Sequence, residues 1–130
     1  HCSNALKMAQ FLESSEKISW VNYPNLPSNK YYEMACKYLP KGSCGVISFG
    51  IKGGRQAAEE FMGHLTLASI ETHVADSRTC CLHPASSTHR QMNDEQLKAA
   101  GVSPDLIRLS VGLEHINDLI GDVKSALDRI

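Results

Sequence analysis

The segment CGVISFGI at positions 44–51 constrains the fold most strongly, because it is apolar on both faces of an extended chain. Alternate residues of a strand point to opposite sides of a sheet, so this segment predicts a central strand covered on both sides. A second apolar run, LIRLSV at 106–111, predicts another buried strand but carries Arg108 in its middle. Arginine does not readily lose its proton, so the fold has to give Arg108 either water or an anionic partner.

Segments with helical periodicity separate the strands. In 3–17, apolar residues recur at Ala5, Met8, Ala9 and Leu12, which is typical of a helix with one buried face. Similar patterns predict helices at 29–39, 56–65 and 114–130, and short strands at 18–24, 66–70 and 79–83. Because helices and strands interleave and the links between the later strands are short, the sequence predicts an α+β fold, with helices packed on a mostly antiparallel sheet.

Three local patterns add detail to this prediction. The helix at 29–39 is expected to bury Tyr31, Met34, Ala35 and Tyr38 or Leu39. Asn93 followed by Gln96 predicts a capping box at the start of a short helix. The sequence GIKGGR at 50–55 matches neither glycine-rich phosphate-binding motif, so it predicts a strand-to-helix turn that needs glycine.

The composition excludes several classes of protein. The chain has 130 residues, 42% of them apolar and 21% charged, which suits one globular domain. No apolar run approaches the roughly 20 residues that span a bilayer, and no signal-peptide pattern opens the chain. The formal net charge is −1 and the charges are scattered, so neither nucleic acid nor a membrane is an expected partner.

The cysteines predict a reduced, cytoplasmic protein. Five are present, an odd number, and Cys80 and Cys81 are adjacent, which makes a poor disulfide framework. Cys44 and Cys80 lie in strand-like runs and are expected to be buried thiols. Cys80, Cys81, His83 and His89 lack the spacing of a structural zinc site, so no metal site is expected.

Arg108 has two interpretations from the residues alone. In the structural one it forms an ion pair with Asp105 or Glu114, or extends to water from an edge strand. In the functional one its planar guanidinium binds a substrate carboxylate through two parallel hydrogen bonds, on a strand that supplies rigidity. The residues show no complete catalytic constellation beside it.

Two stretches, LHPASSTHRQM at 82–92 and AAGVSPDLIRLSVGLEHINDLIGDVKSAL at 99–127, closely resemble the carboxy-terminal region of the Cys/Met-metabolism (trans-sulfuration) family of pyridoxal-phosphate (PLP) enzymes. The stretch 20–54 is most similar to the O-acetylhomoserine sulfhydrylases of that family. The resemblance implies that residues 1–130 form the small C-terminal domain of a fold-type-I transferase. It further implies a cytoplasmic homotetramer, in which an N-terminal domain of the same polypeptide holds PLP.

The resemblance also implies that this chain is one part of the enzyme. The chain begins His1-Cys2-Ser3 within a helical pattern and without methionine, and none of its eight lysines lies in the family's TK motif. We therefore expect a truncated chain that lacks the cofactor domain and the lysine that binds PLP covalently. Alone, it is expected to bind no cofactor and to be inactive.

The resemblance assigns two substrate-binding positions and no catalytic, cofactor or metal residue in this chain. Arg108 matches the arginine that binds the α-carboxylate of the amino-acid substrate, and Thr79 aligns with a serine-like position that lines the substrate site. The implied reaction replaces acetate on O-acetylhomoserine by sulfide or a thiol, giving homocysteine or methionine. The alternatives are a cystathionine γ-synthase or lyase, and a non-catalytic interaction domain with the same fold.

Overall fold

A computed structural model describes all residues from 1 to 130 and contains one five-stranded sheet in the order β1-β2-β5-β4-β3. The pairs β1–β2, β2–β5 and β4–β5 are antiparallel, and only β3–β4 is parallel. The predicted α+β class with a mostly antiparallel sheet is therefore confirmed. The strands are β1 (Ile18–Asn22), β2 (Val46–Ile51), β3 (Ser69–Ile70), β4 (Cys80–Leu82) and β5 (Leu106–Ser110).

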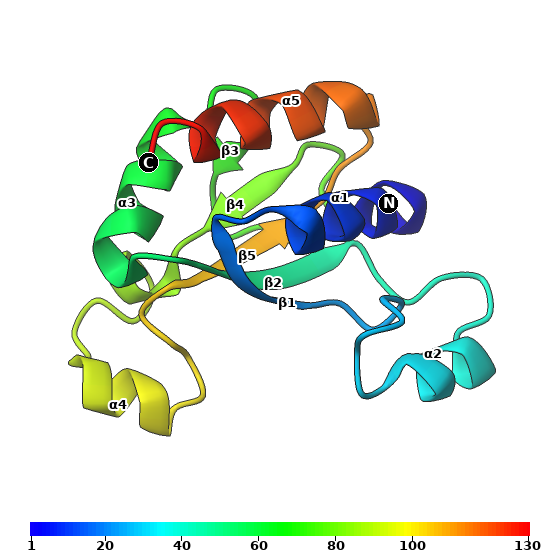
Figure 1. Cartoon of the computed structure of the whole chain (residues 1–130), viewed down its shortest axis with the longest axis horizontal. Coiled ribbons are helices and arrows are strands. Elements are labelled where there is room, and N and C mark those ends of the chain that lie inside the picture. The colour runs from blue at the N-terminus through cyan, green and yellow to red at the C-terminus, as the bar shows by residue number, and fades with distance from the viewer.

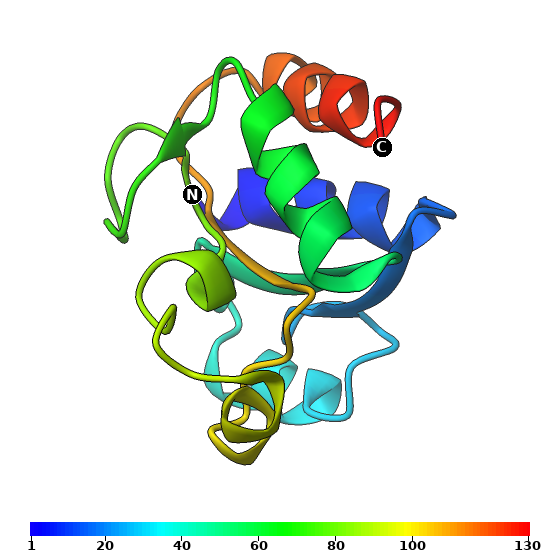
Figure 2. The same cartoon turned by 90° about the vertical axis from the view of Figure 1, so that its left-hand side faces the viewer.

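Three long helices cover one face of the sheet, and two short helices lie on the other side (Figure 1; Figure 2). The covering helices are α1 (Cys2–Ser14), α3 (Gly54–His64) and α5 (Ile116–Leu127). On the other side lie α2 (Tyr32–Tyr38) and α4 (Asp94–Ala99), and a short 3-10 helix, η1, spans Pro84–Ser86. We call the sheet surface opposite α1, α3 and α5 the open face.

The core lies between the sheet and the three long helices. Ile107 and Leu109 of β5 are fully buried and belong to the same cluster as Leu12 of α1. Phe49 of β2 packs edge-on against Phe61 of α3, with ring centroids 6.0 Å apart. Alternation along the strands directs the residues between these, including Arg108, to the open face.

The expectation that residues 44–51 form a strand covered on both sides is wrong for one side. Helices cover only the face that carries Ile47, Phe49 and Ile51. On the open face, Ser48 is half-buried, and Gly50 is buried by a close neighbour rather than by a helix. A Cβ atom on Gly50 would lie 2.1 Å from the Trp20 indole nitrogen, so only glycine fits there.

The expected burial of the second helix is also wrong. In α2 only Ala35 is buried, whereas Met34 is 58% exposed and Tyr38 66% exposed. Tyr31 and Leu39, at the ends of α2, are exposed as well. Because α2 lies on the other side of the sheet from the long helices, this chain leaves its larger apolar side chains, Met34 and Tyr38, exposed.

The local turn and cap predictions are confirmed. Asn93 and Gln96 form the capping box of α4, each side chain accepting the other residue's backbone N–H. Gly53, at the start of α3, has a φ of 105°, a conformation that favours glycine. No helix combines the length and the apolar character that crossing a membrane requires.

All five cysteines are free. Cys80 and Cys81 are buried on opposite faces of β4, and the Cys81 thiol lies 3.4 Å from the Met62 sulfur. Cys44 is only half-buried, which corrects its expected burial. Cys36, on α2, is exposed.

Candidate substrate-carboxylate site

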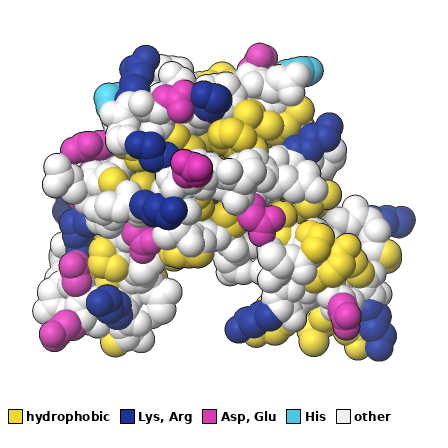
Figure 3. Space-filling view, in the orientation of Figure 1, with side chains coloured by type: hydrophobic (Ala, Val, Ile, Leu, Met, Phe, Trp, Pro, Cys, Tyr) yellow, Lys and Arg dark blue, Asp and Glu magenta, His cyan; other side chains and the backbone are white.

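The open face of the sheet is hollowed between two lobes that carry α4 and α2 (Figure 3). Arg108 lies on this face, at the middle of the central strand β5. Its register partners are Ser48 on β2 and Leu82 on β4. Two neighbouring strands therefore hold the Arg108 backbone, while its side chain points away from the apolar core.

Arg108 forms no ion pair within this chain. It has no carboxylate within 4.0 Å, and its single hydrogen bond runs from Nη2 to the Thr72 carbonyl oxygen, at 2.7 Å. The Nε atom is buried and has no hydrogen-bond partner. A guanidinium has five N–H donors, and a buried donor without a partner costs about 1–3 kcal/mol. Arg108 thus retains donors for an anionic group from outside the chain.

The two acids proposed as structural partners of Arg108 are engaged elsewhere. Asp105 accepts hydrogen bonds from the Ser19 hydroxyl and the Trp20 indole N–H, both at 3.1 Å. Glu114 accepts the Thr79 N–H at 2.6 Å and the Thr79 hydroxyl at 2.9 Å. The interpretation of Arg108 as one half of an internal ion pair is therefore wrong.

Thr79, the second position assigned by resemblance, is fully buried just before β4. Its hydroxyl donates to Glu114 and accepts the Gly112 N–H at 2.9 Å. These bonds join the start of β4 to the turn between β5 and α5. The predicted contact of Thr79 with substrate stays a prediction, and in this structure the hydroxyl has both its partners inside the chain.

A segment that the sequence analysis left unassigned lies beside Arg108. Residues 71–79 connect β3 to β4, and they supply the Thr72 carbonyl to Arg108. Asp76 shapes this segment by accepting the Arg78 N–H at 2.9 Å, and that hydrogen bond holds the pKa of Asp76 below its usual range. The local sequence, ETHVADSR, carries no signal for the contact, because Thr72 and Arg108 are brought together only by strand pairing.

Other polar clusters serve structure. His83 is buried, and its Nε2 donates to the Pro104 carbonyl at 2.8 Å while the Ser86 hydroxyl donates to Nδ1 at 2.8 Å. The Ser87 hydroxyl donates to the His83 carbonyl. No group of three or more His, Cys, Asp or Glu side chains has the arrangement of a metal site.

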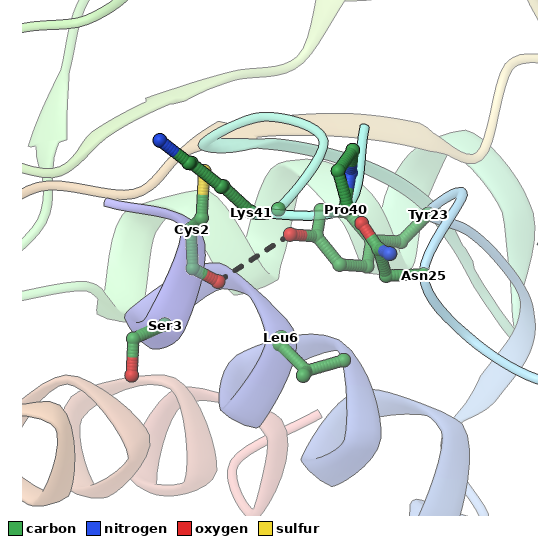
Figure 4. Close-up of a pocket in the computed structure, with 8 residues that line it drawn as sticks. Cys2, Ser3, Leu6, Tyr23, Asn25, Pro40 and Lys41 are labelled. Atoms are coloured by element: carbon green, nitrogen blue, oxygen red, sulfur yellow. Dashed lines mark hydrogen bonds between the residues drawn. The ribbon is translucent and has the colours of Figure 1, made fainter. Parts of the chain in front are cut away.

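A second hollow, of about 380 Å³, lies at the start of α1 (Figure 4). Tyr23 lines it, and its hydroxyl donates to the Cys44 carbonyl at 2.9 Å and lies 3.4 Å from the Cys2 carbonyl. Burial raises the pKa of Tyr23, so its hydroxyl stays protonated as a donor. The hydroxyl therefore ties α1 to the segment before β2.

The sequence profile described as Cys/Met metabolism PLP-dependent enzyme matches residues 1–128. The chain belongs to this family. Among curated relatives, it is 45% identical to an O-acetyl-L-homoserine sulfhydrylase of Thermus thermophilus over 98% of its length, covering 30% of that protein. It is 47% identical to a homocysteine/cysteine synthase of Kluyveromyces lactis, over all of its length and 32% of that protein.

A solved structure of this family supports the same assignment. The chain superposes with a TM-score of 0.89 on a Campylobacter jejuni protein described as an O-acetylhomoserine (thiol)-lyase, which contains N'-pyridoxyl-lysine-5'-monophosphate. The two are 40% identical, over 98% of this chain and 30% of the other. The chain thus spans about a third of the length of the relatives it matches.

Proposed function

We propose that residues 1–130 form the C-terminal domain of a PLP-dependent O-acetylhomoserine sulfhydrylase, in which Arg108 binds the α-carboxylate of the substrate. The observation that carries this proposal is the state of Arg108. It lies on the open face without a carboxylate partner and with a buried, unpaired Nε. A carboxylate would satisfy such a donor through strong, charge-assisted hydrogen bonds.

In the proposed reaction, acetate at the γ-carbon of O-acetylhomoserine is replaced by sulfide or a thiol, giving homocysteine or methionine. PLP, when bound, supplies the electron sink that makes the substrate's α- and β-hydrogens acidic. Arg108 would hold the carboxylate and so orient the substrate's α-carbon, which is a positioning contribution. The names of the Thermus thermophilus and Kluyveromyces lactis relatives support this choice of substrate.

The residues of this chain do not fit the cofactor's own attachment site. All eight lysines are exposed, so none has the enclosed surroundings of a lysine joined to PLP. We therefore assign PLP to an N-terminal domain of the same polypeptide, which would face Arg108 across the open face. A cytoplasmic homotetramer, with no nucleic acid or membrane partner, completes the proposal, and the five free cysteines suit a reducing compartment.

A trans-sulfuration lyase is the second candidate. An L-methionine gamma-lyase of Fusobacterium nucleatum is 40% identical over the whole of this chain, which covers 33% of the lyase. Arg108 would have the same carboxylate-binding role in such an enzyme, so the two candidates differ in the reaction rather than in this site. Product analysis with O-acetylhomoserine plus sulfide, and separately with methionine alone, distinguishes them.

The test of the carboxylate role uses the full-length enzyme. Arg108→Ala is expected to lower kcat/KM about 30- to 1000-fold, because it removes charge-assisted hydrogen bonds to the substrate. Arg108→Lys is expected to recover only part of this loss, since an ammonium keeps the charge and lacks the planar fork. Arg129→Ala, an exposed arginine beyond α5, serves as the matched control.

A comparison of the amino-acid substrate with its carboxamide analogue isolates the carboxylate. The wild-type enzyme is expected to prefer the carboxylate strongly, and Arg108→Ala only weakly. If both proteins discriminate equally, Arg108 does not bind the carboxylate.

A further inference from the structure

The segment 72–75 forms a strap across the open face beside β5. At one end the Glu71 N–H donates to the Cys81 carbonyl, at 3.2 Å. At the other end the Leu113 N–H donates to the Ser77 carbonyl, at 2.8 Å. Residues on either side of the strap are thus tied down, Glu71 to β4 and Ser77 to the turn that follows β5.

Between these ends, two side chains of β5 hold the strap. Arg108 Nη2 donates to the Thr72 carbonyl at 2.7 Å, and the Ser110 hydroxyl oxygen accepts the Ala75 N–H at 3.2 Å. Ser110 is 2% exposed and lies two residues from Arg108, so both side chains point to the open face. They are the only side chains of β5 that hydrogen-bond to the strap.

The hydrogen bond from Ala75 to Ser110 stabilises the strap, because the backbone conformation at Ala75 is unfavourable on its own. Ala75 has a φ of 60°, the only residue other than glycine with a positive φ, and that conformation costs an L-residue energy. A hollow of about 260 Å³, lined in part by Val46, Val74, Ala75 and Ser110, adjoins this point. Close packing therefore does not replace the hydrogen bond there.

We propose that Ser110 is a positioning residue for Arg108: by holding Ala75 it keeps the Thr72 carbonyl in place, and this carbonyl sets the orientation of the guanidinium. A guanidinium is planar, so fixing the direction of one N–H fixes the directions of the others. Ser110 does not touch the substrate in this arrangement. The inference rests on the proposed role of Arg108 in binding the substrate carboxylate.

The experiment is a double-mutant cycle in the full-length enzyme with O-acetylhomoserine and its carboxamide analogue. Ser110→Ala is expected to lower kcat/KM for the carboxylate substrate about fivefold, as expected for one neutral hydrogen bond. The carboxamide should be affected much less. In an Arg108→Ala background, Ser110→Ala should have no further effect on either substrate, because the group it positions is gone.

Matched variants separate the hydroxyl from effects of volume. The side chains introduced by Ser110→Thr and Ser110→Val have nearly the same shape, but only threonine keeps the hydroxyl that accepts a hydrogen bond. The kcat/KM of Ser110→Thr for the carboxylate substrate is therefore expected to be about fivefold higher than that of Ser110→Val. If Ser110→Ala does not fold, the comparison of Ser110→Thr with Ser110→Val tests the inference in its place. Ser125→Ala is the control, since Ser125 lies exposed on α5, on the other side of the sheet, and makes no side-chain hydrogen bond.

Two outcomes would overturn the inference. Ser110→Ala could lower activity equally in the wild-type and Arg108→Ala backgrounds, or threonine and valine could behave alike. If instead Arg108→Ala leaves the preference for the carboxylate intact, the proposed function of Arg108 fails, and that result is visible in the single mutant before the cycle is completed.

Discussion

At the scale of single residues, polar side chains in this chain differ in how many of their hydrogen-bonding atoms have partners. Glu114 accepts two hydrogen bonds from Thr79, and Asp105 accepts one from Ser19 and one from Trp20. Arg108 has one partner, a backbone carbonyl, and a buried Nε with none. The carboxylates of Asp105 and Glu114 have their hydrogen-bond partners inside the chain, whereas the Arg108 guanidinium keeps N–H donors for a ligand.

Ala75 offers a test of backbone strain at one residue. Ala75→Gly is expected to stabilise the protein by about 0.5–1 kcal/mol, because relief of the left-handed conformation exceeds the added entropy of glycine in the unfolded chain. Urea unfolding measures the change. Ala57→Gly, inside α3, is the opposite control and should destabilise by about 1 kcal/mol. A loss of stability in Ala75→Gly would show that the strap is not strained there.

The cysteines are expected to react in order of exposure. Cys36 should react first with a thiol reagent, because it lies exposed on α2. Cys81 should react last, since burial raises its pKa and keeps the thiol protonated at neutral pH. Peptide mapping by mass spectrometry after timed labelling gives the order, and Cys36→Ser should remove the fastest phase. Rapid labelling of Cys81 in the folded protein would contradict its burial.

At the scale of elements, helices are attached to the sheet in different ways. α5 contributes Leu119, Val123 and Ala126 to the core, and its buried Asp122 also binds the segment before β3. α2 contributes only Ala35. The attachment of α5 through the Asp122 carboxylate therefore contributes stability that depends on pH, in addition to the contribution of apolar packing.

Asp122 gives the pH dependence of this attachment. It accepts the N–H and hydroxyl of Thr66 and the N–H of Ala68, at 2.7–3.0 Å. Burial alone would raise the pKa of Asp122, but these hydrogen bonds outweigh it and hold the pKa below its usual value of 3.8. A lowered pKa in the folded state stabilises the protein above the unfolded pKa, and this contribution is lost as the pH falls through the folded value.

Asp122→Asn is therefore expected to destabilise the protein by about 2 kcal/mol at neutral pH and by less at acid pH. An amide offers one acceptor oxygen in place of two and brings an NH2 group toward N–H donors. Urea unfolding between pH 2 and pH 7 (roughly, the range over which a carboxyl titrates) measures the difference. Asp118→Asn, exposed on the same helix, is the control. An equal loss at every pH would assign Asp122 a role that does not depend on its charge.

At the scale of the whole molecule, three long helices cover one face of the sheet, and the other face lies between the lobes that carry α2 and α4. Arg108, on the central strand β5, belongs to that second face. The chain covers 30–33% of the curated relatives described above. Its exposed lysines offer no enclosed site for PLP. Under the proposed function, the chemistry is thus expected to need the PLP-binding domain that the proposal places in the same polypeptide.

We expect the 130-residue chain alone, mixed with PLP, O-acetylhomoserine and sulfide, to release neither acetate nor homocysteine. The reason is that a substrate held by Arg108 would have no cofactor positioned beside its α-carbon. Chromatographic product analysis over hours measures this, with the full-length enzyme as the positive control. Turnover that disappears on replacing one lysine of the chain would refute the division of roles between the domains.

The sequence alone determined the elements and the family. Apolar periodicity located the helices and strands, and the pair Asn93 and Gln96 located the capping box, because helix and strand formation depend on neighbours a few residues away. Long matching motifs identified the family, now shown over residues 1–128. The same local patterns misjudged α2, whose apolar residues match a buried helix in spacing but lie where the chain provides nothing to cover them.

Only the tertiary structure decided which side chains meet. Strand pairing sets Arg108 beside Thr72, 36 residues earlier in the chain, and Ser110 beside Ala75, 35 residues earlier. It also sends Asp105 and Glu114 to other donors, which removed the internal ion pair that the sequence allowed. Contacts between distant segments depend on the register of strand pairing, because the register decides which face of the sheet each side chain occupies. A shift of one residue in the register of β5 would move Arg108 and Ser110 to the opposite face.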